Sequence, residues 1–176
     1  PIKSSAASDV YKRQYLNGEY LTSLGTLADK IATTTWKVEG GYTTNLYDVP
    51  KTAYQYEVGS SASSTTVDKK IGLMYVSDYY YSASPSAWTL VGYNSSDATK
   101  DYRAAKTINW LYLGSYEWTV SRYSDRTTHA FSVTSTGDVL HSNVTDSYAV
   151  RPSFNLESSV KYVSGSGSMS DPVRVN

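Results

Sequence analysis

The clearest hydrophobic pattern in the chain is a helical one near its beginning. Within YLNGEYLTSLGTLADKIATTTW, apolar side chains recur every three or four residues, at Leu16, Tyr20, Leu24, Leu27 and Ile31. This spacing places them on one face of an α-helix. Asn17 is the expected N-cap, and the β-branched run Thr33–Thr35 weakens the far end. The sequence therefore predicts an N-terminal helix with one buried face.

Shorter patterns further along predict strands. TAYQYEV (52–58), IGLMYV (71–76), TINWLYL (107–113) and YEWTVSRY (116–123) are short, β-favouring segments, and HAFSVTSTGDVLHS (129–142) reads as a hairpin that turns at 135–138. In DSYAVRPSFNLE the alternation puts one set of side chains on an apolar face: Tyr148, Val150, Pro152, Phe154 and Leu156. The opposite face carries Ala149, Arg151, Ser153 and Asn155. Pro152 indicates an edge position or a strand end.

The stretch from 77 to 106 is polar and irregular, and a long loop inside a compact domain is commonly functional. The expected fold class is α+β. An N-terminal helix packs on a small twisted antiparallel sheet, with the long irregular loop region beside it.

Composition narrows the function classes. Eighteen Tyr and four Trp stand against two Phe, a choice that suits half-wet binding surfaces, although strands of a β-rich protein favour the same residues. Cysteine is absent, which excludes disulfides, thiolate metal sites and thiol nucleophiles. No basic run marks a nucleic-acid partner, and no apolar run reaches the roughly 20 residues that span a bilayer.

The first fourteen residues, PIKSSAASDVYKRQ, are unpatterned and polar. One codon set for residues 4–14 reads as the adaptor of transposase-based sequencing libraries, so we expect residues 1–14 to be an artefact without a structural role. Without Lys3, Lys12, Arg13 and Asp9, the 16 basic and 16 acidic residues become 13 and 15. The domain is then expected to occupy residues 15–176 and to be truncated on its N-terminal side. Membrane anchoring would depend on a missing N-terminal segment.

Few residues suggest catalysis or metal binding. His129 and His141 flank the hairpin, but a zinc site needs a third ligand, and Asp97 and Asp101 lack the spacing of a calcium loop. No nucleophile elbow, phosphate loop or marked carboxylate pair is present, so we expect no enzyme, metal or cofactor.

Aromatic side chains are the better candidates for binding a ligand. The expected ligand-binding residues are Trp88, Tyr93, Tyr80, Tyr81 and Tyr123. Trp110 and Trp118 are expected in the core. We further expect Arg151 to be largely buried, with Glu117 or a carbonyl as acceptor and with Trp118 or Tyr148 stacked on its guanidinium.

Several segments in this order resemble a known family: YLNGEY, KIGLMYVSDY, NWLY, EWTVSR and YAVRPSFNLESSVKYVSGSGSMSDP. The family is a domain of unknown function in surface proteins of uncultured Gram-positive gut bacteria, often behind a prepilin-like helix. The closing strand is also similar to the formylglycine-generating-enzyme branch of the C-type-lectin-like folds. The resemblance implies a C-type-lectin-like scaffold at the cell surface. It carries over neither the copper-dependent oxidase activity, which needs cysteines, nor calcium-dependent lectin activity, whose E-P-N or Q-P-D loop is absent, and Ala149 replaces the glycine of the closing pattern.

The expected function is therefore a non-catalytic extracellular binding or display domain of a surface or pilus-like protein, with a glycan or a host protein as ligand. One alternative is a degenerate enzyme-like domain with residual small-molecule or metal binding. The other is a purely structural stalk or tip module.

Overall fold

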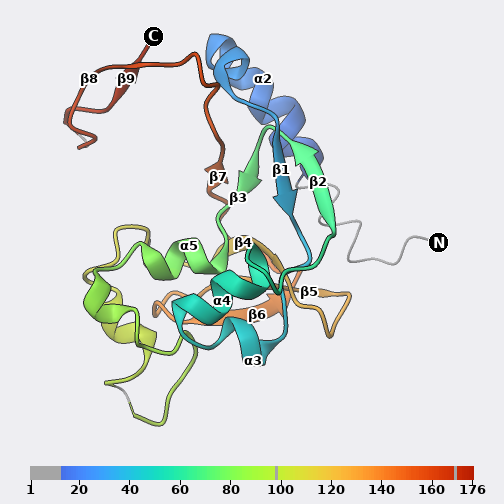
Figure 1. The fold of residues 1–176 in the computed structure, drawn as a ribbon, viewed down its shortest axis with the longest axis vertical. Coiled ribbons are helices and arrows are strands. Elements are labelled where there is room, and N and C mark those ends of the chain that lie inside the picture. Colours follow the sequence, from blue (N-terminus) through green and yellow to red (C-terminus); the bar gives the residue numbers. More distant parts are fainter. Residues whose placement is uncertain (1–12, 98, 169) are drawn as a thin grey trace.

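The computed structural model describes residues 13–97, 99–168 and 170–176, and it mixes short helices with small antiparallel sheets (Figure 1). The α-helices are α2 (Leu21–Ser23), α3 (Thr43–Leu46), α4 (Pro50–Glu57) and α5 (Val76–Tyr81). A π-helical turn covers Leu16–Tyr20, and 3-10 helices cover Gly25–Lys30, Pro85–Ala87 and Tyr102–Ala105. The strands are β1 (Thr34–Lys37), β2 (Thr66–Lys69), β3 (Gly72–Leu73), β4 (Glu117–Arg122), β5 (His129–Val133), β6 (Val139–Asn143), β7 (Pro152–Ser153), β8 (Tyr162–Ser164) and β9 (Arg174–Val175).

The strands form several small sheets instead of the single sheet expected. Within the described residues, β4, β5 and β6 make a three-stranded antiparallel sheet, and the other pairs are β1–β2, β3–β7 and β8–β9. Figure 1 shows a lower body formed by the three-stranded sheet with α3, α4 and α5. Above it stand the N-terminal helix and the β1–β2 and β3–β7 pairs, and the β8–β9 hairpin projects sideways from this upper part as an arm. No helix in the described part of the chain is long and apolar enough to cross a bilayer.

The N-terminal helix buries the face that its sequence predicts. Leu16 and Ile31 are buried, and Tyr20, Leu24 and Leu27 are half-buried. The helix already includes Arg13 and Gln14, so it does not begin at Tyr15; residues 1–12 lie outside the described part. Asn17 is not an N-cap: its side chain accepts from the Ile71 amide (2.9 Å) and donates to the Ile71 carbonyl (2.8 Å). The α-helical geometry ends at Leu24, and Gly25 follows with a φ of 57°, a conformation that glycine adopts without steric cost.

The segment predicted as a strand at 52–58 forms helix α4 instead. Pro50 occupies the first helical position, where its fixed φ and missing N–H are tolerated. The residues that α4 buries are Pro50, Ala53 and Glu57, and their spacings of three and four residues follow the helical period. The alternating tyrosines Tyr54 and Tyr56 lie on the exposed face.

Glu57 joins three elements of the body although it is a fully buried carboxylate. Its oxygens accept hydrogen bonds from the amides of Val76 (2.9 Å) and Ser77 (2.8 Å) at the first turn of α5, and from the Ser121 hydroxyl of β4. Burial raises the pKa of Glu57 to about 7, and these hydrogen bonds only partly oppose the shift. Glu57 thus serves as an N-terminal cap for α5 from a distance.

The stretch expected as an irregular loop contains ordered structure at its start. Its residues 77–81 belong to α5, where Tyr79 and Tyr80 are fully buried and contribute to the main core together with Tyr102 and Phe131. Their hydroxyls are satisfied: Tyr79 donates to the Gly137 carbonyl (2.8 Å) and Tyr80 to the Leu46 carbonyl (2.6 Å). Tyrosine here fills a core because each ring finds a backbone acceptor.

The hairpin prediction is confirmed, the strand predicted at 71–76 is shortened to β3, and the strands predicted at 107–113 and in the closing segment are not borne out in full. β5 and β6 pair in register from His129–Asn143 to Val133–Val139. The segment 107–113 contains no strand; it is a turn that buries Asn109 and Leu111 and exposes Ile108, Trp110 and Leu113. In the closing segment only β7 forms, pairing with β3, so Pro152 does lie at an edge. The predicted apolar face is not a buried one, since Val150 and Leu156 are exposed.

Candidate functional site

The structure separates the five aromatic residues predicted to bind ligand. Tyr81 and Trp88 are in contact on the surface. Tyr93 and Tyr123 belong to a different aromatic group, and Tyr80 lies in the core with no accessible surface. A direct ligand contact by Tyr80 would therefore require the core to open.

Tyr81, Trp88 and Trp110 form what we call the aromatic patch. The rings of Tyr81 and Trp88 meet edge to face with centroids 5.0 Å apart, and the Trp88 indole N–H donates to the Ala83 carbonyl (3.0 Å). Trp110 is tied to the same segment, since its amide donates to the Ser82 carbonyl (3.4 Å). Its side chain is 77% exposed, against 39% for Trp88 and 37% for Tyr81. The prediction that Trp110 lies in the core is wrong.

Asn109 explains why Trp110 points outward. The Asn109 amide group donates to the Tyr79 carbonyl (2.7 Å), and its side-chain oxygen accepts from the Leu111 amide (2.9 Å) and the Ser82 hydroxyl. Asn109 also forms a bridge with Ala83, which fixes residues 108–111 beside the end of α5. Because Asn109 occupies the inward position, its neighbour Trp110 is held on the surface.

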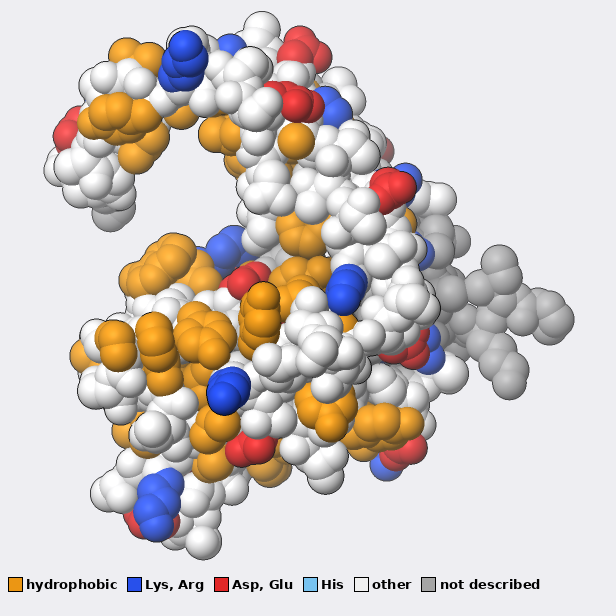
Figure 2. All heavy atoms as spheres, in the orientation of Figure 1, with side chains coloured by type: hydrophobic (Ala, Val, Ile, Leu, Met, Phe, Trp, Pro, Cys, Tyr) orange, Lys and Arg blue, Asp and Glu red, His pale blue; other side chains and the backbone are white. Residues whose placement is uncertain are grey.

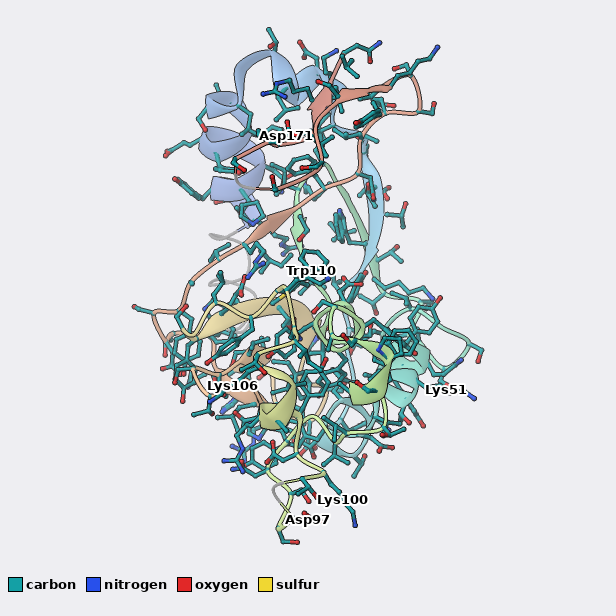
Figure 3. All side chains as sticks on the ribbon, turned by 90° about the vertical axis from the view of Figure 1, so that its left-hand side faces the viewer. Lys51, Asp97, Lys100, Lys106, Trp110 and Asp171 are labelled. Atoms are coloured by element: carbon teal, nitrogen blue, oxygen red, sulfur yellow. The ribbon has the colours of Figure 1, made fainter. Side chains whose placement is uncertain are left out.

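The arm extends over the side of the body that carries Trp110. Figure 3 places Trp110 at the upper edge of the body, below Asp171 of the arm. Figure 2 shows an open hollow between arm and body, with apolar side chains on both sides of it. On the arm, the exposed apolar residues are Tyr162, Val163 and Val173. Large exposed aromatic and aliphatic side chains gathered in one region are typical of interaction surfaces.

A second aromatic group lies against β5 and β6. Tyr93 stacks on Tyr47 with centroids 4.4 Å apart, and His141 stacks on Tyr123 at 4.5 Å. Tyr47 and Tyr123 both meet Phe131 edge to face, which joins the two stacks. These rings extend the packing of the core outward. Tyr93 and Tyr123 therefore make packing contacts, which their positions in the sequence did not indicate.

The two histidines lie together, as their places on the hairpin suggested. The His129 and His141 rings are 5.3 Å apart. Burial first, and then the nearby Arg126 guanidinium, lower the pKa of both imidazoles; for His141 the His129 ring lowers it as well. Within residues 13–97, 99–168 and 170–176, no three His, Asp or Glu side chains gather in a way that could hold a metal ion. The calcium candidates Asp97 and Asp101 bind Thr99 and Arg103, respectively.

Arg151 contacts the carboxylate that the sequence suggested. Its guanidinium donates to Glu117 from Nε (2.7 Å) and from an Nη atom (3.1 Å), and the same Nη donates to the Leu111 carbonyl (2.5 Å). The Glu117 side chain is 2% exposed and that of Arg151 is 26% exposed, so Arg151 is less buried than expected. Trp118 and Tyr148, proposed as stacking partners, stack on each other at 4.8 Å. Trp118 is buried, as predicted.

Comparison of the chain with protein-family models, with curated proteins and with solved structures gave no match. Of the members of the aromatic patch, the sequence indicated Tyr81 and Trp88 but not the surface position of Trp110. The signal that could have found it is Asn109, a β-disfavoured residue in the middle of an apparent strand.

Proposed function

We propose that the chain is a non-catalytic extracellular binding or display domain of a bacterial surface or pilus-like protein, and that the aromatic patch contacts its ligand, a glycan or a host protein. One observation carries this proposal: Trp110 is 77% exposed, and its backbone amide is hydrogen-bonded to Ser82, the residue that follows Tyr81 of the exposed Tyr81–Trp88 pair. Leaving an indole exposed forgoes roughly 2 kcal/mol of burial, and several large exposed apolar side chains in one region are typical of interaction surfaces.

The chemistry of the patch suits either ligand. An indole face stacks on the C–H face of a sugar ring, and exposed Trp and Tyr are also the residues most enriched at the energetic centre of protein interfaces. Their rings lose little conformational freedom on binding, because Tyr81 and Trp88 already pack against each other. No charged group of the patch would select a nucleic acid or an anionic lipid.

The scaffold and location in this proposal rest on the sequence resemblance. The ordered series of segments from YLNGEY to the closing YAVRPSFNLE supports a C-type-lectin-like domain of the prepilin-associated surface family. The fold itself is a mixture of short helices and small antiparallel sheets. Fold alone would not assign a ligand in any case.

The structural-module alternative has one specific observation in its favour. The β8–β9 arm exposes Tyr162, Val163 and Val173, which a neighbouring subunit could cover. The two functions can be distinguished by removing the Trp110 side chain. If the patch binds the ligand, ligand binding is weakened. If the chain is a structural module that assembles through the arm, neither binding nor assembly changes. The enzyme-like alternative would need converging carboxylates and histidines, and the described residues provide no group of three.

Trp110→Ala is expected to weaken ligand binding strongly without affecting folding. The full chain is tested on an oligosaccharide array and on immobilised mucin, which carries both glycan and polypeptide. We expect loss of binding by at least roughly tenfold, equivalent to about 1.4 kcal/mol, with an unchanged melting temperature because the side chain packs against little. Tyr42→Ala removes another exposed aromatic (53% exposed) outside the patch and serves as the control. Equal binding by wild type and Trp110→Ala would refute the assignment of the patch.

A further inference from the structure

A cavity of about 230 Å³ lies between the β1–β2 pair and the β4–β5 edge of the three-stranded sheet. Trp36 and Val67 line it from β1 and β2, and Trp118 and Ala130 from β4 and β5. None of its described lining residues belongs to the aromatic patch. The cavity is thus a second feature of the molecule that the proposed function does not use.

The apolar wall of the cavity is fixed before any ligand arrives. Trp36 lies flat against the backbone of β3, where a Cβ on Gly72 would come within 2.7 Å of the indole ring. The Trp36 indole N–H donates to the Lys69 carbonyl (2.9 Å), so the one polar group of the ring has a hydrogen-bond acceptor. Pre-formed apolar walls with a few polar groups at one end are the usual architecture of small-molecule sites.

The described charged residues of the lining are mainly basic: Arg13, Lys69 and Arg122 stand against Glu39. Arg122 is the best-placed of them, because its side chain is half-buried and 35% exposed. Its contact with Glu39 is long, at 3.8 Å, and its buried Nε has no hydrogen-bond acceptor in the described part of the chain. The charge of this guanidinium is therefore only weakly compensated by the described residues, which favours an anion beside its accessible part.

The backbone around Arg122 is held in place. Gly40 has a φ of 70°, and a Cβ there would lie 2.1 Å from the Arg122 carbonyl oxygen. The Gly41 amide donates to that same oxygen (3.2 Å). A side chain at position 40 would clash with the Arg122 backbone, so Gly40 allows the two chain segments to pack closely beside the cavity.

We propose that this cavity binds a small organic monocarboxylate, with its apolar body against the indoles of Trp36 and Trp118 and its carboxylate on the Arg122 guanidinium. The volume exceeds the roughly 150 Å³ that accommodates benzene and is below the roughly 300 Å³ of a drug-sized site. A ligand with one ring and a short carboxylate side chain therefore fits. The fork of an arginine matches a carboxylate in geometry as well as in charge. This proposal stands independently of the aromatic patch.

The test uses 3-phenylpropionate as the probe and phenethylamine, which has a similar body and the opposite charge, as the matched control ligand. Binding to the full chain is measured by calorimetry and by ligand-observed NMR. We expect 3-phenylpropionate to bind and phenethylamine to bind at least tenfold more weakly. Arg122→Gln should weaken 3-phenylpropionate binding by roughly ten- to hundredfold, the loss typical of a charged hydrogen bond. Arg126→Gln makes the same charge change on an exposed residue outside the lining and should have no effect.

A second variant tests the location. Val67→Phe adds volume to the cavity wall from a half-buried strand position, and it should abolish binding of 3-phenylpropionate. Trp110→Ala should leave that binding unchanged, which separates this proposal from the one about the patch. The proposal is overturned if 3-phenylpropionate does not bind at millimolar concentration, or if Arg122→Gln or Val67→Phe, shown to be folded by circular dichroism, binds it as wild type does.

Discussion

Glu57→Ala is expected to lower the free energy of unfolding by about 3–5 kcal/mol at pH 5. The substitution leaves three buried donors without an acceptor: the amides of Val76 and Ser77 and the hydroxyl of Ser121. Each stranded buried donor costs about 1–3 kcal/mol, and the vacated volume adds to the loss. Urea unfolding followed by circular dichroism measures the change. Glu157→Ala removes an exposed carboxylate and should stay within about 0.5 kcal/mol of wild type.

The same residue gives the stability a characteristic pH dependence. The pKa of Glu57 is about 7 in the folded protein against an ordinary value of 4.5, so the folded state binds the extra proton between these two values. Its contribution is therefore complete below about pH 4.5, falls as the pH rises towards 7, and is constant above that. The stability difference between wild type and Glu57→Ala should accordingly shrink from pH 5 to pH 8. A difference that grows over this range would show that the native pKa is lowered, and a loss below 1 kcal/mol at pH 5 would show that Glu57 does not hold α5.

Arg151→Ala is expected to cost about 3 kcal/mol, because it strands the buried carboxylate of Glu117 together with the Leu111 carbonyl. Glu117→Ala should cost less, since Arg151 is 26% exposed and can turn to water. Arg151→Lys should fall between wild type and Arg151→Ala, because an ammonium cannot make the two-point contact with Glu117 and also reach Leu111.

Urea midpoints of the single variants and of the Arg151→Ala/Glu117→Ala double variant form a thermodynamic cycle. We expect the double variant to be less destabilised than the sum of the two single changes. Arg174→Ala is the control, because its ion pair with Asp171 is exposed on both sides (59% and 51%) and should contribute little. Equal effects of Arg151→Ala and Arg174→Ala would show that Arg151 is not part of the scaffold.

Local pattern predicted the elements whose burial is decided by one face. In the N-terminal stripe from Leu16 to Ile31, the apolar positions recur with the helical period and face the protein. In the β5–β6 hairpin, the residues pair in the register that a hairpin with a turn at 135–138 predicts. The strand prediction for residues 52–58 was wrong because the alternating tyrosines lie at the surface. The buried positions are Ala53, a small residue, and Glu57, an ionisable one. Hydrophobicity is uninformative there, and Pro50 was the stronger signal.

The candidate site could be predicted only in part, and the reason is physical. Four aromatic residues have similar size and secondary-structure propensity: Tyr80, Tyr81, Trp88 and Trp110. Tyr80 is nevertheless fully buried, and Trp110 is the most exposed of the four. What decides between them is the set of long-range hydrogen bonds made by Asn109 and by the Tyr80 hydroxyl. Such bonds join residues tens of positions apart, and a single sequence does not encode them as a periodic signal.

The four tryptophans allow a direct test of the central claim that the aromatic patch is the ligand surface. In a ¹⁵N-labelled full chain, each indole N–H gives its own signal, assigned with single Trp→Phe variants. The oligosaccharide or mucin fragment that binds most strongly in the array experiment is then titrated in. We predict that the Trp110 signal shifts most and that of Trp88 next, while those of Trp36 and Trp118 stay in place. A bound ligand that leaves the Trp110 signal unmoved, or that shifts Trp36 or Trp118 instead, would show that the aromatic patch is not the ligand surface.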